Sequence, residues 1–221
     1  MKVIFRNTKL EFETQMPIKV ADLVGGYALK NAYPWGTSWA VLVDILTGEL
    51  GSDAAPQAIF GTSITNDATR ATLTKNIITS IKGGAPQKIT EGIEYSRCKI
   101  AIHSSGSVLF WNSGNVIEKT LSVGENEDTD IMVGCRRTSK TQPFLGKYAG
   151  IYIANNISAE NLRAFLDKPL DFATNSYVPK NINGLVWKDS IGNLDLTLSN
   201  EAVVTEIVGR LKREEVGNVQ E

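Results

Sequence analysis

The stretch from residue 97 to residue 123 constrains the fold more than any other part of the sequence. Apolar and polar residues alternate in its first run, 97–103, and in its third, 116–123, and the second run, 108–111, is apolar throughout. The three runs are separated by Ser104-Ser105-Gly106-Ser107 and by Asn112-Ser113-Gly114-Asn115. Alternation with a period of two is typical of strands, and a short Gly/Asn turn between two such runs predicts a hairpin. Two hairpins in series form a meander, so the sequence predicts an antiparallel sheet here.

Further strand-like runs lie on both sides of this meander. Residues 39–46 are almost continuously apolar and rich in β-branched side chains, which predicts a strand covered on both faces. Shorter runs cover residues 58–61, 69–81, 131–135, 146–154, 184–187 and 194–198. Residues 14–37 carry several prolines and glycines, and we expect them to be irregular.

One helix is predicted. Ser158 is a suitable N-cap, and Leu162, Phe165 and Leu166 follow with i, i+3, i+4 spacing before Pro169 ends the segment.

Many short strands with few helices predict an all-β chain, a two-sheet antiparallel β-sandwich of the jelly-roll type with one or two peripheral helices. The 221 residues are within reach of one all-β domain. We expect residues 1–200 to form this domain. Residues 201–221 are predicted to be a C-terminal tail, either a helix, from the spacing of Val204, Val208 and Leu211, or an oligomerising segment.

Composition excludes several classes of partner. A formal net charge of −1 disfavours nucleic-acid binding through a broad basic surface. No segment approaches the roughly 20 apolar residues of a membrane-spanning helix, so we expect no membrane insertion. The N-terminal residues lack the apolar core of a signal peptide, which predicts synthesis for the cytoplasm unless a signal has been removed. Cys98 and Cys135 are too few for a disulfide framework, and we expect two small, partly buried apolar side chains.

Four segments follow one another in a characteristic order. They are the meander with Val108-Leu109-Phe110-Trp111, the strand Ile131-Met132-Val133-Gly134, the run Phe144 to Ile153 with the helix after Ser158, and the loop Trp187 to Asn193. This order resembles the concanavalin A-like lectin and glucanase sandwiches, specifically their laminin G-like branch, over roughly residues 35–200. The resemblance implies a sandwich with lectin-like ligand binding.

A second resemblance concerns the setting of the domain. A lone lectin-like module without an evident secretion signal is similar to structural proteins of tailed phages, the crAss-like type among them. This resemblance implies a virion protein that assembles in the host cytoplasm, with other virion proteins or further copies of itself as partners.

We expect this chain not to be an enzyme. A glycosidase on this fold needs two carboxylates flanking a cleft, whereas Glu91-Gly92-Ile93-Glu94 lacks the alternation that would place both on one sheet face. His103 is the only histidine, and no Gly-x-Ser-x-Gly motif supplies a serine nucleophile for it. A degenerate glycoside hydrolase remains the enzymatic alternative.

Three tryptophans beside polar turns suggest where a glycan would bind. A flat aromatic ring packs against the C–H face of a sugar, and amides and carboxylates bind its hydroxyls. The candidate ligand-binding residues are Trp35, Trp111, Asn112, Asn115, Trp187, Asp189 and Asn193. The same tryptophans also fit the core, because tryptophan is highly buried on average.

Calcium is the metal that the sequence leaves open. One histidine and two cysteines are too few for a zinc-type cluster. The laminin G-like resemblance implies loop carboxylates as calcium ligands, and the acidic run supplies Glu125, Asp128 and Asp130. Such a run is more often a solvated loop. No other cofactor is expected.

Together these observations predict a non-enzymatic virion structural or display protein, such as a capsid decoration, head fibre or tail fibre protein. Its lectin-like domain would serve assembly or adhesion to a cell-surface glycan, where weak contacts gain strength by repetition. The alternative is a glycan-binding module of a bacterial cell surface.

Overall fold

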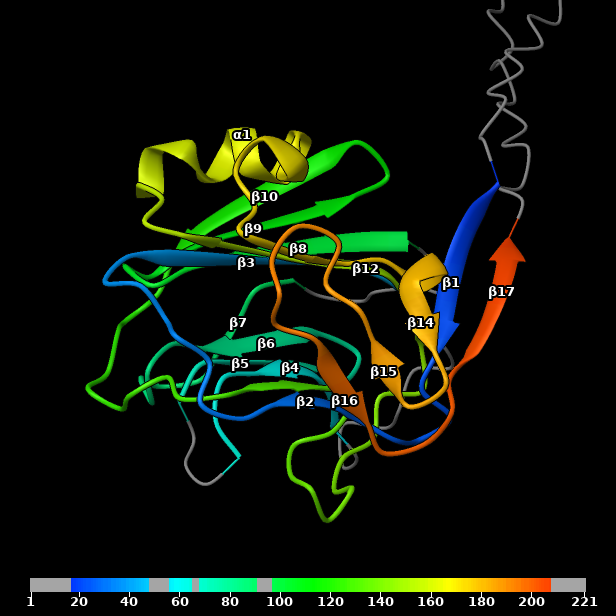
Figure 1. Ribbon diagram of the computed structural model, residues 1–221. Helices are drawn as coiled ribbons and strands as arrows, with labels where there is room; N and C mark the ends of the chain where they lie inside the picture. The colour runs from blue at the N-terminus through cyan, green and yellow to red at the C-terminus, as the bar shows by residue number, and fades with distance from the viewer. Residues whose placement is uncertain (1–16, 48–55, 65–67, 91–96, 208–221) are drawn as a thin grey trace, which may run out of the picture.

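Two stacked antiparallel sheets form the body of the protein (Figure 1). The computed structural model describes residues 17–47, 56–64, 68–90 and 97–207. No helix in these ranges is long and apolar enough to span a bilayer.

Sheet A contains the predicted meander. In the described chain its strands run in the order β10 (Asn115–Thr120), β9 (Ser107–Asn112), β8 (Arg97–His103), β3 (Trp39–Leu46), β12 (Lys147–Asn155), β1 (Ile18–Asp22) and β17 (Val203–Ile207). An eighth strand, β13 (Asn175–Tyr177), pairs with the Ile151–Ile153 part of β12. The succession β8, β9, β10 confirms the two predicted hairpins.

Sheet B lies beneath sheet A in Figure 1. Within the described ranges its strands run in the order β14 (Ile182–Asn183), β15 (Val186–Trp187), β16 (Leu196–Leu198), β2 (Ala28–Lys30), β11 (Ile131–Val133), β4 (Gln57–Gly61), β5 (Arg70–Leu73), β6 (Ile77–Ser80) and β7 (Gln87–Lys88). Both sheets are antiparallel, which confirms the predicted all-β sandwich.

The main core fills the space between the sheets. Val41, Val43 and Ile45 of β3 point inward, and Phe60 and Leu73 face them from sheet B. Burying one such side chain contributes about 1.5–3 kcal/mol. The Tyr148 hydroxyl donates a hydrogen bond of 2.7 Å to the carbonyl of Ile59, which connects the two sheets and satisfies a polar group inside the core.

Helix α1 (Leu162–Asp167) covers part of the outer face of sheet A (Figure 1). The 3₁₀ turn η1 (Ala159–Asn161) leads into it, and Leu162, Phe165 and Leu166 are buried as predicted. They pack on a second cluster that includes Leu42 and Ala101. Because sheet B covers the other face, all eight residues of β3 are buried. Two further 3₁₀ turns follow, η2 (Pro169–Asp171) and η3 (Pro179–Asn181).

The prediction of a helix near the C-terminus is wrong for residues 201–207, the part of the predicted segment that the structure describes. Val203–Ile207 forms strand β17, which pairs with β1 from Ile18↔Ile207 to Asp22↔Val203. Its β-branched residues favour a strand, and the edge of sheet A offers a partner. The sandwich therefore extends beyond residue 200, while residues 208–221 lie outside the described ranges.

The segment expected to be irregular also contributes to both sheets. Residues 14–37 contain β1 and β2, which are short and separated by a turn around Gly25. The sequence signal was weak because these strands have only five and three residues. Residues 1–12, whose alternation also predicts one or two short strands, fall outside the described residues.

The single histidine is buried and fully engaged. The backbone N–H of Ser105 donates to Nδ1 of His103 (3.1 Å), so Nε2 carries the proton and donates to the carbonyl of Ile157 (3.0 Å). His103 therefore ties the end of β8 to the chain that leads into η1.

Both cysteines are free thiols, and both are buried more completely than the sequence led us to expect. Burial raises the pKa of Cys98 from 9.0 to about 12 and the pKa of Cys135 from 9.0 to about 11. In the unfolded chain both thiols would ionise near their ordinary value. The fold thus favours the neutral thiols, and their contribution to stability is complete below pH 9 and is lost as the pH rises towards 12.

We therefore predict that the free energy of unfolding, measured by urea titration, falls steadily as the pH is raised above about 9. A Cys98→Ala/Cys135→Ala variant should show a smaller fall in the same range, because the two thiols no longer contribute while tyrosines with raised pKa, such as Tyr33 (about 12), still do. Equal pH dependence of the two proteins would contradict the prediction.

Candidate ligand-binding cleft on the outer face of sheet A

A cleft of about 610 Å³ lies on the outer face of sheet A, beside the area that α1 covers. This volume is in the usual range for small-ligand sites. Strands β1, β3, β8, β12 and β13 and the turns η2 and η3 supply its walls. The described lining residues are Ile18, Lys19, Asp44, Arg97, Ala149, Tyr152, Leu170, Ser176, Val178, Pro179, Lys180, Asn181 and Ser190.

An ion pair between β3 and β8 forms part of the cleft wall. Arg97 donates from Nε (2.9 Å) and Nη2 (2.6 Å) to the two carboxylate oxygens of Asp44. The hydrogen bonds to Asp44 raise the pKa of Arg97 above its ordinary value. The Asp44 side chain is only 7% exposed, so Arg97 supplies the charge that makes its burial tolerable. The Arg97 side chain is 39% exposed and faces the cleft.

The aromatic group of the cleft is Tyr152, and Gly150 makes room for it. A Cβ at Gly150 would lie 2.8 Å from the Tyr152 hydroxyl and 2.9 Å from its Cε2, so any larger residue there would displace the ring. Burial raises the pKa of Tyr152, and the nearby Asp44 carboxylate adds to the rise. The phenol therefore remains a hydrogen-bond donor at neutral pH.

Ser176 lies directly opposite Tyr152 in the pairing of β12 with β13. Directly opposed residues of an antiparallel pair share a face, so the Ser176 side chain lies on the cleft side of the sheet. Its hydroxyl is buried and has no hydrogen-bond partner in the described part of the chain. An unpartnered buried hydroxyl costs about 1–3 kcal/mol, and a ligand oxygen at the base of the cleft would supply the missing bond.

Of the predicted residues, Trp111 lies on the same face as the cleft. The register joins Gly150, Asp44, Lys99 and Trp111 in one row across β12, β3, β8 and β9. Two strand spacings, about 10 Å, separate Trp111 from Asp44. The ring is partly buried, and the Lys99 ammonium sits 5.5 Å from its centroid.

The two predicted asparagines lie at the tip of the β9–β10 hairpin, outside the cleft. Asn112 is half-buried and Asn115 is exposed. Asn112 accepts a hydrogen bond of 2.8 Å from the neighbouring Ser113 hydroxyl, within a turn where Ser113 and Gly114 have positive φ. The structure therefore places both in a hairpin turn, adjacent in sequence to Trp111 but not among the cleft residues.

The prediction that Trp187 contacts a ligand is wrong. Its side chain is fully buried, packs against Tyr148 and Tyr177, and donates from Nε1 to the carbonyl of Val178 (2.9 Å). The polar residues that follow Trp187 organise a loop on the outside of the core. The sequence motif is the same for a core tryptophan with a turn beside it and for an exposed one.

Asp189 is the organiser of that loop. Its carboxylate accepts hydrogen bonds from the backbone N–H of Ser176 (2.9 Å) and Ile191 (3.1 Å) and from the Asn175 amide. Burial alone would raise the pKa of Asp189, but these hydrogen bonds hold it below 3.8. Asn193 is exposed on the same loop. Asp189 thus positions β13, and with it Ser176, at the cleft.

Trp35 packs against the core between the sheets instead of facing a ligand site. Its ring centroid lies 4.6 Å from that of Tyr33 and 4.7 Å from that of Trp39. Its Nε1 donates to the carbonyl of Asp130 (3.3 Å). The role of this partly buried indole in the structure is to attach the chain before β3 to the core.

The acidic run does not form a cation cluster. Asp128 accepts from the Thr62 hydroxyl, Asp130 accepts from the backbone N–H of Ala32 (3.1 Å), and Glu125 is exposed. One Asp128 oxygen is buried without a partner in the described chain, but calcium needs six to eight oxygens. Among the described residues, no three acidic, histidine or cysteine side chains converge as metal ligands.

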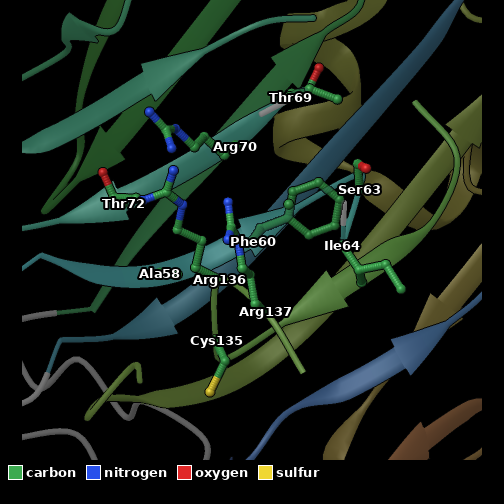
Figure 2. Close-up of a pocket in the computed structure, with 12 residues that line it drawn as sticks. Ala58, Phe60, Ser63, Ile64, Thr69, Arg70, Thr72, Cys135, Arg136 and Arg137 are labelled. Carbon is green, nitrogen blue, oxygen red and sulfur yellow. The ribbon is translucent and has the colours of Figure 1, made fainter. Parts of the chain in front are cut away.

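A second hollow lies on the outer face of sheet B, where Arg70, Arg136 and Arg137 extend their side chains over β4 and β5 (Figure 2). Its volume is about 20 Å³, which is room for a single water molecule. It is therefore too small for a saccharide.

No protein-family model matches the sequence, and no curated protein matches it. Similar solved structures include domains LG4-5 of the mouse laminin alpha1 chain, with 11% identity, a TM-score of 0.43, and coverage of 61% of this chain and 41% of that chain. The binding domain of botulinum neurotoxin DC in complex with SialylT has 14% identity, a TM-score of 0.47, and coverage of 85% and 47%. NanB sialidase from Streptococcus pneumoniae has 13% identity, a TM-score of 0.41, and coverage of 58% and 24%.

This chain spans less than half the length of each of these three proteins. At such identities the likeness concerns the fold alone, and the sandwich class follows from the two sheets described above.

The structure assigns Asp189 a stabilising role. We predict that Asp189→Ala lowers the free energy of unfolding by about 2–3 kcal/mol, because it leaves the Asn175 amide and the Ser176 N–H without their acceptor. Asn193→Ala on the same loop should change it by less than about 0.5 kcal/mol. Urea denaturation measures both, and equal effects of the two substitutions would contradict this role.

Proposed function

We propose that this chain is a non-enzymatic glycan-binding module and that its ligand occupies the outer-face cleft. One observation carries the proposal: Tyr152, the Arg97–Asp44 pair and the unpartnered Ser176 hydroxyl line a single cleft of about 610 Å³. An aromatic ring beside convergent polar groups is the combination that saccharide recognition requires.

The remaining lining residues support a saccharide over a purely apolar ligand. Ile18, Val178 and the 63% exposed Leu170 offer apolar surface to C–H groups. Asn181 and Ser190, which are hydrogen-bonded to each other at 2.6 Å, offer exchangeable partners for hydroxyls. The mixture matches the two kinds of surface on a sugar ring.

Binding is favoured over catalysis by the state of the cleft carboxylate. Asp44 is the only carboxylate among the described lining residues, and Arg97 holds both of its oxygens. Glycosidases use two carboxylates, about 5–9.5 Å apart, and one must be able to protonate or attack. Glu91 and Glu94, the residues considered from the sequence, lie outside the described ranges.

Glycans are ligands of some proteins with similar structures. Cell entry of botulinum neurotoxin type C depends on interaction with two ganglioside molecules. The binding domain of botulinum neurotoxin DC forms a complex with SialylT. The proposal for this chain rests on the cleft and not on these likenesses.

A finer proposal concerns where the module acts. We propose display on a virion assembled in the host cytoplasm, with other virion proteins or further copies of the chain as partners, and a bacterial cell surface as the alternative. The support is the resemblance in sequence to tailed-phage structural proteins. Repetition on a particle would turn weak glycan contacts into adhesion.

A glycan array tests the proposed binding. The intact chain should give reproducible saccharide hits, and Tyr152→Ala should weaken them at least about tenfold because the aromatic contact is lost. Gly150→Ala should weaken them too, since the added methyl displaces the Tyr152 ring.

Tyr27→Ala, which removes a half-buried tyrosine beside sheet B, is the matched control and should leave the hits unchanged. No hit for the intact chain, or hits that survive both cleft substitutions, would overturn the proposal.

Light scattering tests the display proposal. A displayed virion protein should form a trimer or larger assembly, as symmetric fibres and decorations do. Truncation after Ile207 should dissociate that assembly while β17 and the sandwich are retained. A monomer under all conditions would favour an isolated binding module.

A further inference from the structure

We propose that the outer-face cleft selects an acidic saccharide and binds its carboxylate between Arg97 and Lys180. This inference rests on the proposed glycan binding and adds the class of ligand. It is carried by the charge of the cleft, by the geometry of Arg97 and by the buried hydroxyl of Ser176.

The cleft is positive on a chain that is otherwise balanced. Lys19, Arg97 and Lys180 line it together with a single described carboxylate, Asp44. The whole chain has 23 basic and 24 acidic residues and a formal net charge of −1. Three cations against one carboxylate around a concave surface concentrate a positive potential there, because low-dielectric walls focus the field.

Arg97 can hold a second carboxylate without releasing the first. A guanidinium has five N–H donors in a planar fork, and Asp44 engages Nε and Nη2. In the described chain Nη1 has no hydrogen-bond acceptor, and the side chain is 39% exposed and lines the cleft. A ligand carboxylate at this edge would be bound as Asp44 is bound, by charge-assisted hydrogen bonds.

Lys180 and Lys19 approach the cleft from two other elements. Lys180 lies on η3 and Lys19 on β1, and both are exposed residues that line the cleft. On β1, Lys19 lies directly opposite Glu206 of β17. An anion in the cleft would therefore be surrounded by cations from three separate segments of the chain.

Hydroxyl recognition distinguishes a sugar acid from a simple anion. The Ser176 hydroxyl is buried and unpartnered in the described structure, and the Tyr152 phenol, directly across the strand pair, remains protonated at neutral pH. These two groups bind neutral oxygens, whereas Arg97 and Lys180 bind the charge. A saccharide that carries one carboxylate presents both chemistries at once.

The carboxylate is favoured over a phosphate by Asp44. Its negative charge lies in the same cleft and repels a second negative charge on the ligand, which penalises a dianion more than a monoanion. Arg97 also shows by its pairing with Asp44 that its planar fork fits a planar carboxylate in this position.

The experiment compares two sugars that differ in one group. Methyl α-D-galacturonide and methyl α-D-galactoside, which has a hydroxymethyl group in place of the carboxylate, are titrated against the intact chain by ligand-observed NMR at low salt. We expect the galacturonide to bind about tenfold more tightly, the effect of a few favourable charge contacts, and the ratio to shrink at 0.5 M NaCl by screening.

The Lys19→Gln/Lys180→Gln double variant should lower the galacturonide-to-galactoside affinity ratio severalfold, because two of the three cleft cations are lost while Arg97 remains. Arg137→Gln, which removes a charge from the exposed loop after β11 of sheet B, is the matched control and should leave the ratio unchanged. Arg97 itself is left intact, because its loss would leave the buried Asp44 carboxylate without a counter-charge.

The outcomes separate this inference from the proposed function. Equal binding of the two sugars would overturn the acidic selectivity and leave glycan binding in place. No binding of either sugar, together with a silent glycan array, would remove both. Competition by inorganic phosphate as strong as that by the galacturonide would show a general anion site and would overturn the carboxylate assignment.

Discussion

The structure depends on β12 at the centre of sheet A. This strand pairs with β3 along its length on one side, and on the other side with β1 near its start and β13 near its end. A register shift between Tyr148 and Gly150 divides the two parts. Before it, Tyr148 points into the core between the sheets. After it, Tyr152 faces the cleft, so one strand connects the core to the candidate site.

The outer face of sheet A is used in two ways. Over one half, Leu42, Ala101 and their neighbours are apolar, and α1 covers them. Over the other half, Asp44, Lys99 and Arg97 occupy the equivalent outward positions, and they are not part of the apolar cluster under α1. A change of outward residues from apolar to charged along β3 and β8 therefore decides where the helix ends and the cleft begins.

Local patterns predicted the sandwich well because its hairpins are made by neighbouring residues. The alternation and the Gly-containing turns between residues 97 and 120 are both short-range signals, and the meander followed from them. The cleft has no such signal, since Asp44, Arg97, Tyr152 and Ser176 are distant in sequence and meet only through strand register. The prediction that Trp187 contacts a ligand was wrong for a related reason. Only the packing of Tyr148 and Tyr177 against its ring shows that Trp187 belongs to the core. The Gly150-x-Tyr152 spacing was the one available hint of the site.

The pairing of Ile18 with Ile207 places the two ends of the described sandwich side by side on one edge of sheet A. A module attached to neighbouring chain at both points would need almost no linker to be inserted into a loop of another protein. The same arrangement sets its mechanical response. Tension applied through both ends would break the hydrogen bonds between β1 and β17 one pair after another, starting at Ile18 and Ile207, instead of loading all pairs at once. In a module attached through one end alone, tension would not act across the β1–β17 pair in this way.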